Sequence, residues 1–294
     1  MRVVVVGAGA WGTTVASMLA ARHEVVLWAR EPEVAAAVSE RAENPVYLPD
    51  VALSPALRAT TDLGAVGGAE VVVLAVPAQH VRSVATDLAP HLDPGVPVVS
   101  LAKGIERSTL RRPSEILAEV MPSHDPARIG VVSGPNLAKE VAAGHPSATV
   151  VALPDAAAAA TVQDVLRSDR FRVYTSDDVV GCEIGGAVKN VLAIAAGMVA
   201  GLGLGWNTRA ALITRGLAEL ARLGVSLGGQ PLTFLGLAGN GDLIATCCSP
   251  LSRNHRVGAA LAGGRTIEVI LAGAPAVAEG AASTPGALEP TLGF

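Results

Sequence analysis

Aromatic side chains are scarce in this sequence: Phe, Trp and Tyr together make up 3% of its 294 residues, although half of all residues are hydrophobic. The core must therefore be filled by Ala, Val and Leu. Small apolar side chains of this kind favour helices and parallel strands that pack closely together. Because the chain is longer than a typical single domain, two domains are expected.

Cysteine and an excess of positive charge are also lacking. The three cysteines are Cys182, Cys247 and Cys248, with no Cys-x-x-Cys pair. This indicates a reduced, intracellular protein without a disulfide framework or a zinc site, and we expect no metal. The 22 basic and 26 acidic residues give a net charge of −4. No nucleic-acid partner is expected, and an anionic substrate would need a local basic site.

Signal and membrane segments are not apparent either. The first residues run directly into four valines at 3–6, which is typical of a core strand and not of a signal peptide. The longest apolar stretch, residues 191–206, is interrupted by glycines and is short for a membrane span. We therefore expect a cytoplasmic protein with no stable membrane insertion.

Strands and helices alternate along the first part of the chain. Short β-branched runs predict strands, and the stretches between them have helical character. Alternation with short connections predicts an α/β fold with an N-terminal, Rossmann-type, doubly wound parallel sheet. The predicted strands are residues 3–6, 25–28, 71–76, 96–101, 129–133, 148–152 and 171–174, and the predicted helices are 12–22, 32–41, 79–89, 113–120, 138–143 and 155–166.

The strand pattern stops after Tyr174. From Val179 onward, apolar residues recur at helical spacing. We predict two domains: a dinucleotide-binding Rossmann domain over residues 1–175, followed by an all-α substrate and catalytic domain over residues 176–294. Glycine-rich breaks that should separate the helices lie at 201–205, 224–229, 239–241 and 263–264.

A Gly-x-Gly-x-x-Gly motif follows the first predicted strand and opens the first helix. Gly7 would allow a tight turn, Gly9 would let a pyrophosphate approach the main chain, and Gly12 would let the helix pack on the strand. The helix N-terminus adds free N–H groups and the positive end of a dipole. The alternative is a glycine-rich turn that binds nothing.

The end of the second predicted strand bears on the choice of cofactor. An Asp or Glu at this place accepts hydrogen bonds from the ribose of NAD and repels the 2′-phosphate of NADP. Here Arg30 comes before Glu31, and a guanidinium matches a phosphate in a bidentate way. We predict that NADPH is used at least as well as NADH, with Arg30 on the 2′-phosphate. The alternative is that Arg30 points to solvent and Glu31 binds the ribose.

Lys189 is the most informative polar residue, because it lies within an otherwise apolar helix. Burying an ammonium group is costly unless it is paired. Asp242 could be the partner, or only an acid in the first turn of a helix, while Lys189 could instead extend to solvent. Asp242 and Thr246 are four residues apart and would share a helix face. Lys103 and Arg253, each of which alone could lie on the surface, would complete a cationic pocket for a phosphate and a developing alkoxide.

Several segments together resemble bacterial NAD(P)-dependent glycerol-3-phosphate dehydrogenase, over about residues 1–280. In the family, helices continue beyond the segment that matches residues 277–280, so the resemblance implies a shortened C-terminus, with the helical domain partly uncovered after about Glu279. The segments that carry the resemblance are residues 7–12, 23–28, 44–49, 103–104, 133–140, 185–190, 208–223, 241–243 and 252–254.

The resemblance implies roles for single residues. Lys189 would protonate the alkoxide as hydride reaches the ketone carbon, and Lys103 would bind substrate and polarise the carbonyl. Asn190, Asp242 and Thr246 would orient the lysine and the substrate. The implied substrate-binding residues are Lys103, Gly134, Asn136, Lys189, Asp242, Ser252, Arg253 and Asn254, and the implied cofactor-binding residues are Gly7, Gly9, Ala10, Trp11, Gly12, Arg30, Lys103, Ala138, Arg253, Val277 and Glu279.

The function expected on these grounds is the reversible, NAD(P)H-dependent reduction of dihydroxyacetone phosphate to sn-glycerol 3-phosphate, which would feed phospholipid synthesis. Catalysis would rest on orientation, electrostatic support of the alkoxide and proton transfer. One alternative is a reductase of another small phosphorylated ketone or oxo-acid. Another is a non-catalytic dinucleotide-binding sensor. A homodimer is left open.

Overall fold

The computed structural model describes residues 1–272 and residue 280. Val277, Glu279 and the C-terminal stretch that was expected to be uncovered therefore lie outside the described residues. The chain divides into two compact units. The sheet unit comprises Met1–Ala102, Pro113–Val132 and Ala138–Asp177, and the helical unit comprises Lys103–Arg112, Ser133–Leu137 and Asp178–Phe294.

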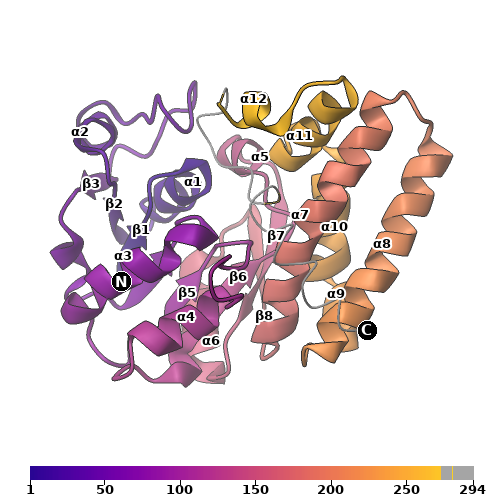
Figure 1. The fold of residues 1–294 in the computed structure, drawn as a ribbon. Helices are drawn as coiled ribbons and strands as arrows, with labels where there is room; N and C mark the ends of the chain where they lie inside the picture. Colours follow the sequence, from indigo (N-terminus) through magenta and orange to yellow (C-terminus); the bar gives the residue numbers. More distant parts are fainter. Residues whose placement is uncertain (273–279, 281–294) are drawn as a thin grey trace. The chain divides into compact units, whose positions relative to one another are not determined.

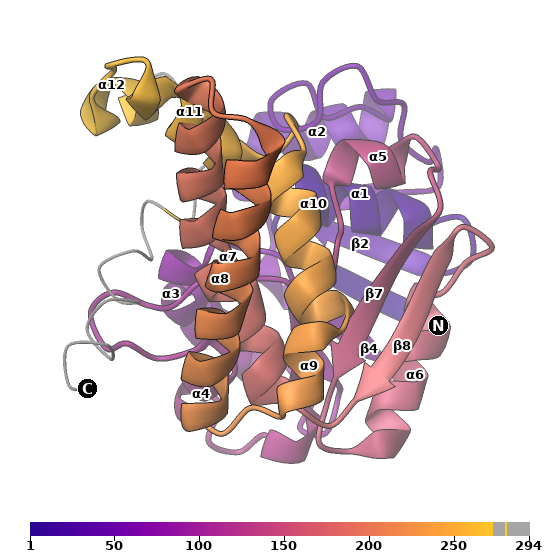
Figure 2. The same cartoon turned by 90° about the vertical axis from the view of Figure 1, so that its right-hand side faces the viewer.

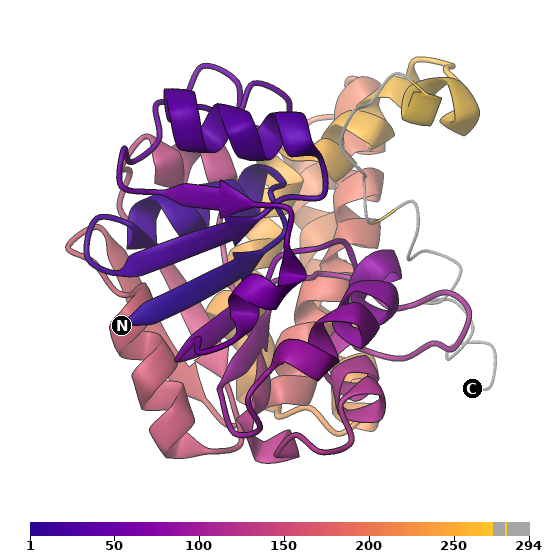
Figure 3. The same cartoon turned by 90° about the vertical axis from the view of Figure 1, so that its left-hand side faces the viewer.

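An eight-stranded sheet forms the frame of the sheet unit, with the strand order β3-β2-β1-β4-β5-β6-β7-β8. The first six positions have the order of a dinucleotide-binding Rossmann sheet. β1 pairs in parallel with β2 and β4, and β7 pairs in parallel with β8 (Figures 1 and 3). The strands are β1 (Arg2–Val6), β2 (Glu24–Trp28), β3 (Arg58–Thr60), β4 (Val71–Leu74), β5 (Val98–Ser100), β6 (Ile129–Ser133), β7 (Ser147–Ala152) and β8 (Phe171–Ser176).

Helices alternate with these strands, so the predicted α/β class is confirmed. β3 was not predicted, because its three residues lack a β-branched apolar run. The helices are α1 (Ala10–Leu19), α2 (Pro32–Arg41), α3 (Val81–Leu88), α4 (Pro113–Val120), α5 (Ala138–Ala142) and α6 (Ala156–Leu166), with short 3-10 turns η1 (Leu63–Val66), η2 (Ala78–His80), η3 (Ala89–His91) and η4 (Pro126–Arg128).

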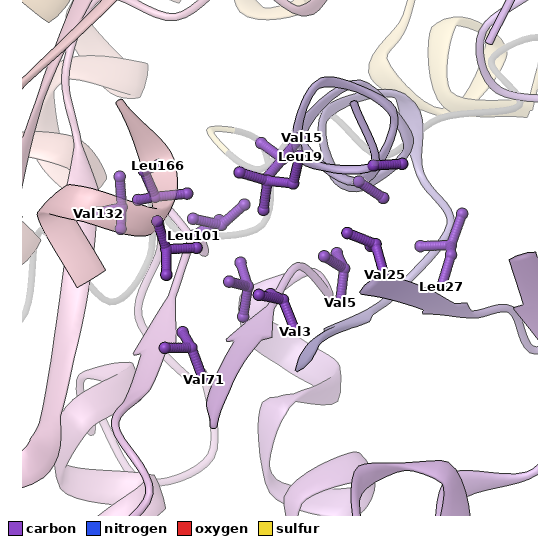
Figure 4. Close-up of a cluster of buried hydrophobic side chains, with 14 of the residues drawn as sticks. Val3, Val5, Val15, Leu19, Val25, Leu27, Val71, Leu101, Val132 and Leu166 are labelled. Carbon is purple, nitrogen blue, oxygen red and sulfur yellow. The ribbon is translucent and has the colours of Figure 1, made fainter. Parts of the chain in front are cut away.

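Two apolar layers cover the two faces of the sheet. In β1, Val3 and Val5 belong to one buried cluster, while Val4 and Val6 belong to the other. Successive side chains of a strand point to opposite faces, so a run of four valines serves both layers. Figure 4 shows the first layer, in which Val3 and Val5 lie near Leu19 of α1. The layers hold β1 in place, and with it the glycine-rich turn that follows.

The helical unit is built around one long helix, α7 (Val179–Gly201). It packs against its neighbours in the same unit, and Figure 2 shows it beside α8. The other elements are α8 (Trp206–Ser226), α9 (Pro231–Leu235), the π-helical turn η5 (Leu237–Gly241), α10 (Asp242–Cys248), α11 (Arg253–Ala262) and α12 (Ile267–Ala272).

α7 is long and apolar enough to cross a membrane by length and composition alone. Half of its most apolar window is buried inside the protein, and the helix contains Lys189 and Asn190 in buried positions. Core helices of soluble proteins meet the same criterion, and α7 packs against α8, α10 and α11. Its apolar character is therefore accounted for by packing within its own unit.

Candidate active site

The glycine-rich turn between β1 and α1 has the shape that its sequence predicts. Gly7 has a φ of +120°, a conformation that L side chains rarely adopt. A Cβ on Gly12 would lie 2.0 Å from the Gly7 carbonyl oxygen, so only glycine lets α1 approach this closely. A Cβ on Gly9 would meet nothing within 4 Å, and Gly9, as the N-cap of α1, has no side chain to cap the helix. The turn therefore has the open approach beside a helix N-terminus that binding of a pyrophosphate requires.

Asn44 supports this turn, a role that sequence reasoning did not assign. Its side chain is fully buried and donates to the Ala8 carbonyl oxygen at 2.9 Å and to Thr13 Oγ1 at 2.8 Å. Its own oxygen accepts from the Tyr47 amide. The Asn-Pro pair at 44–45 is a turn signal in the sequence, but nothing in the sequence indicates that this side chain reaches a loop 36 residues away.

At the end of β2, Arg30 and Glu31 pair with each other. Arg30 is exposed, and its guanidinium lies 2.6 Å from Glu31 Oε1, which also accepts from the Tyr47 hydroxyl at 3.1 Å. Burial is the largest influence on Glu31 and favours its neutral form, but the Arg30 and Tyr47 donors outweigh it and hold the pKa of this carboxyl below its usual range. The Glu31 carboxylate is thus already bound by Arg30 and Tyr47.

Other predicted cofactor residues lie around the same turn. Ala10 and Trp11 form the first turn of α1, and the Trp11 ring packs against Phe171 of β8 with the ring centroids 6.2 Å apart. The Ala138 carbonyl, at the start of α5, accepts from Thr14 of α1 at 3.4 Å. Trp11 therefore offers the turn its backbone, since its ring belongs to the core.

A trio of charges lies in the helical unit: Lys189 and Asp242, which are buried, and Lys103, which is partly exposed. The Lys189 ammonium is 2.5 Å from Asp242 Oδ1, and the Lys103 ammonium is 2.7 Å from Asp242 Oδ2. Lys189 is 4% exposed and Asp242 2%. The interpretation of Lys189 as a buried ammonium with Asp242 as its partner is therefore confirmed, and the alternative of a lysine extending to solvent is wrong.

Neighbouring polar groups fix the trio in place. Thr246 Oγ1 accepts from Lys189 at 2.6 Å and donates to the Asp242 carbonyl at 2.7 Å, as the four-residue spacing predicted. Asn190 donates to the Lys103 carbonyl at 2.8 Å. Lys103 also donates to the Gly134 carbonyl at 2.9 Å. The two ammonium groups are thus held on the two oxygens of one carboxylate.

Burial and charge act on this trio in opposite directions. Burial, the largest influence, lowers the pKa of Lys189 to about 8, although Asp242 opposes the change; the positive charge of Lys103 lowers it further. Burial favours the neutral form of Asp242, but the two lysines outweigh it and keep the pKa of that carboxyl below its usual range. Lys189 can therefore release a proton near neutral pH while Asp242 stays ionised.

Two glycines on α7 explain how these distant residues meet. A Cβ on Gly185, one turn before Lys189, would lie 2.8 Å from the Ala238 carbonyl oxygen, so glycine lets η5 and Asp242 approach the helix. A Cβ on Gly186, one turn before Asn190, would lie 3.1 Å from Ser133 Oγ and 3.5 Å from Lys103 Cγ. Gly185 thus makes room for η5, which leads into Asp242, while Gly186 makes room for Ser133 and lies in ordinary contact with Lys103.

The remaining predicted substrate residues lie in the same unit but differ in burial and in their hydrogen-bond partners. Ser252 caps α11 by accepting from the His255 amide at 3.2 Å, which is a structural role that the sequence analysis did not foresee. Asn254 is buried and donates to Asn190 Oδ1 at 2.9 Å. Arg253 is exposed in the first turn of α11, and Asn136 is partly exposed.

The sequence did not point to a second ion pair, in which a buried acid meets a partly exposed arginine. The Arg112 guanidinium lies 2.7 Å from Glu183 on α7, and the Glu183 side chain is 2% exposed. It ties the segment Lys103–Arg112 to the start of α7. An ionisable residue within an otherwise apolar helix is the signal that could have found Glu183, and it is the same kind of signal that pointed to Lys189.

Comparisons with known proteins agree with this arrangement. Residues 2–159 match the N-terminal family model, and residues 178–290 the C-terminal family model, of NAD-dependent glycerol-3-phosphate dehydrogenase. This chain belongs to that family. It is 54% identical over 274 residues to the Nocardia farcinica protein named glycerol-3-phosphate dehydrogenase (NAD(P)+), covering 91% of this chain and 81% of the relative.

Two further comparisons support the assignment. The chain is 49% identical over 286 residues to glycerol-3-phosphate dehydrogenase (NAD(P)+) 2 of Sphingopyxis alaskensis, with 97% of this chain and 85% of the relative covered. The crystal structure of glycerol-3-phosphate dehydrogenase from Coxiella burnetii has a TM-score of 0.93 at 36% identity, and the match covers 99% of this chain and 89% of that one. The family expected from the sequence is thus confirmed.

Proposed function

We propose that this enzyme catalyses the reversible reduction of dihydroxyacetone phosphate to sn-glycerol 3-phosphate with NADPH or NADH. The observation that carries the proposal is the trio, in which Asp242 holds two ammonium groups and Lys189 has a pKa of about 8. With both lysines protonated, the trio bears one net positive charge. Such a site favours an anionic substrate and a developing alkoxide.

The chain's own residues fit a nicotinamide dinucleotide. Gly7, Gly9 and Gly12 form a turn that main-chain N–H groups line, and a pyrophosphate needs the open space that Gly9 leaves. Ala10, Trp11 and Ala138 would contribute backbone to this site, and Arg30 would contact a 2′-phosphate. When bound, the reduced nicotinamide supplies hydride to the ketone carbon. We assign Val277 and Glu279 to this site only on the family resemblance.

Proton transfer is the task of Lys189. As the carbonyl oxygen gains negative charge, the Lys189 ammonium donates a proton to it, leaving a neutral amine that solvent reprotonates. Asp242 and Thr246 hold the donor in position, since each accepts a hydrogen bond from the Lys189 ammonium. Lys103 would bind the substrate oxygen and support the alkoxide. Asn190 fixes the backbone of Lys103 by donating a hydrogen bond to the Lys103 carbonyl oxygen.

The substrate phosphate would be bound near the start of α11. Arg253 opens this helix and is exposed, and a guanidinium makes charge-assisted, bidentate contacts of the kind that phosphates favour. Ser252 and Asn254 flank it, while Gly134 and Asn136 would line the site beside Lys103. We place the enzyme in the cytoplasm, without stable membrane insertion or nucleic-acid partner, and leave open whether it forms a homodimer.

The deciding experiment measures oxidation of NADPH with dihydroxyacetone phosphate and identifies the product as sn-glycerol 3-phosphate. Lys189→Ala should lower turnover by roughly 10²–10⁴, the usual contribution of a positioned proton donor, with NADPH affinity unchanged. Lys139→Ala is the matched control, because Lys139 is exposed and is the one lysine outside the trio.

The same assay separates the alternatives. Faster turnover of another phosphorylated ketone or an oxo-acid would assign a different substrate. Tight NADPH binding without turnover of any of these compounds would indicate a dinucleotide-binding sensor. Near-normal turnover by Lys189→Ala would remove Lys189 from the mechanism.

A further inference from the structure

A chain of amide hydrogen bonds leads from the trio to a residue far along the sequence. Asn190 Nδ2 donates to the Lys103 carbonyl at 2.8 Å, and Asn254 Nδ2 donates to Asn190 Oδ1 at 2.9 Å. The Gly280 N–H then donates to Asn254 Oδ1 at 3.1 Å. The chain thus joins four segments of the helical unit, and both asparagine side chains in it are buried.

Each asparagine in this chain uses its donor on one side and its acceptor on the other. Neither amide can rotate by half a turn without placing two donors or two acceptors face to face. The bonds therefore fix the orientation of both side chains, and buried polar groups of this kind are costly to leave unpaired. Asn190 and Asn254, expected from the resemblance to act on the substrate, also have this second task.

Gly280 fits its place closely. A Cβ at this position would lie 2.7 Å from Asn254 Oδ1 and 2.9 Å from the Asn190 carbonyl oxygen, distances that real Cβ atoms essentially never show. Gly280 is buried, so an added methyl group has no solvent into which to turn. If residue 280 were larger, either Asn254 or the backbone of α7 would have to move, or residue 280 itself would have to shift away from them.

We propose that Gly280 is a positioning residue: its N–H completes an Asn254–Asn190 relay that holds the backbone of Lys103, and so keeps the Lys103 ammonium on Asp242. The proposal rests on the proposed function for its effect on turnover, but its structural part does not. If the relay is broken, Lys103 is less firmly held beside Asp242 and Lys189. The titratable groups that face Lys189 are Asp242, Lys103 and Cys247. Burial raises the pKa of the Cys247 thiol to about 12, so it is neutral at ordinary pH. Of the two charged groups, Lys103 is the one that the relay controls.

The titration of Lys189 therefore reports the state of the relay without any substrate. The chain has three lysines, Lys103, Lys139 and Lys189, so NMR of protein labelled at the lysine side chains gives few resonances. Lys139 is exposed and serves as the internal reference. Because the Lys103 charge lowers the pKa of Lys189, a displaced Lys103 should let that pKa rise toward its ordinary value.

The variants are Gly280→Ala, Asn254→Ala and the double variant, with Gly205→Ala as the control. Gly205 lies in the same unit with a φ of −74°, and a Cβ there meets nothing within 4 Å. We expect Gly280→Ala to raise the pKa of Lys189 and to lower kcat/KM about threefold to tenfold, as for the loss of one hydrogen bond. Asn254→Ala should raise the same pKa, and the double variant should raise it no further, since both act on one relay.

An unchanged pKa of Lys189 in Gly280→Ala would overturn the proposal, as would additive shifts in the double variant. The measurement stands even if one variant folds poorly, because either single variant gives the pKa of Lys189. If the unmodified protein fails to reduce dihydroxyacetone phosphate while Lys189 titrates as expected, the proposed function fails and the relay stands.

Discussion

Single side chains decide the chemistry of this enzyme, and the ionisation of Lys189 should set its pH dependence. Its pKa is lowered to about 8, chiefly by burial. Below that pH the ammonium can give a proton to the alkoxide, and above it the neutral amine can accept one. We expect kcat/KM for reduction of dihydroxyacetone phosphate to fall as the pH rises through about 8, and kcat/KM for oxidation of glycerol 3-phosphate to fall as the pH drops through the same value.

Full pH profiles in both directions check this prediction. Lys139→Ala should leave both profiles unchanged, because Lys139 lies outside the trio. Profiles that bend in the same sense in both directions, or that show no inflection in this range, would mean that another group carries the proton.

Arg253 should act on substrate affinity and not on proton transfer. A charge-assisted hydrogen bond contributes about 1.5–3 kcal/mol, so Arg253→Ala should raise KM for dihydroxyacetone phosphate by roughly one to two decades. Unphosphorylated dihydroxyacetone should be turned over equally well by both proteins. An equal loss for both ketones would show that Arg253 does not recognise the phosphate. Arg256→Ala is the matched control, since Arg256 is an exposed arginine on the same helix.

How far the site could be predicted differs from residue to residue. Lys189 and Asp242 could be paired from the sequence, because an ammonium in an apolar helix needs an acid. That Lys103 shares the same carboxylate could not, since it lies 139 residues from Asp242 and its strand-end position alone allows a surface lysine. The hydrogen bond from Gly280 could not be predicted from the sequence, because its donor is a backbone N–H, which every residue except proline has.

At the scale of elements, close contact between helices depends on glycines. A Cβ on Gly258 of α11 would lie 1.9 Å from the Ile194 carbonyl oxygen of α7, and the two backbones cannot separate without losing the packing around them. Gly258→Ala should therefore lower the free energy of unfolding by about 1–3 kcal/mol. Gly263→Ala, where the nearest atom is 3.4 Å away, should change it by less than about 0.5 kcal/mol.

Urea unfolding of the two variants and the unmodified protein provides the comparison, with the midpoint and the slope reported separately. Equal stability of Gly258→Ala and Gly263→Ala would show that α7 and α11 can move apart at no cost.

The glycine pattern also shows where element boundaries were predicted wrongly. The predicted break at 224–229 does separate α8 from α9, but it begins too early, since Gly224 lies inside α8. A Cβ there would lie 2.0 Å from the Phe234 ring. The role of Gly224 is to admit a neighbouring aromatic side chain. The break at 201–205 likewise separates α7 from α8. Sequence alone does not distinguish a glycine that ends a helix from one that lets another segment pack against it.

At the scale of the whole molecule, the sequence predicts a division near residue 175, and this assignment of domains stays a prediction. By contact, the sheet unit reaches Asp177, and two short segments of the first half, Lys103–Arg112 and Ser133–Leu137, belong to the helical unit. A linear reading of the pattern cannot place such segments, since each follows directly on a strand. Both carry candidate site residues, so the trio and its surroundings lie within one unit.

The candidate cofactor-selecting residues, by contrast, lie in the sheet unit, which allows cofactor choice to be changed separately from proton transfer. Arg30 is paired with Glu31, whose carboxylate is also held by Tyr47. A 2′-phosphate would offer the guanidinium a stronger, bidentate partner, whereas the ribose of NADH would have to draw Glu31 away from two donors. We therefore expect NADPH to be used at least as well as NADH. Arg30→Asp removes the attraction and adds a repulsion, which should shift the ratio of the two catalytic efficiencies toward NADH by roughly 2–4 kcal/mol.

Catalytic efficiencies with both cofactors, in both proteins, test this expectation. The pKa of Lys189 and KM for dihydroxyacetone phosphate should stay unchanged in Arg30→Asp, because the contacts of Lys189 and Lys103 described above all lie in the helical unit. Arg41→Asp is the control for charge alone: it adds the same charge on an exposed arginine of α2 that pairs with Glu43, and it should leave the ratio as it is. A strong NADH preference of the unmodified enzyme would assign the ribose to Glu31 instead. An equal shift in both variants would mean that the effect is long-range charge, and that Arg30 does not contact the 2′-phosphate.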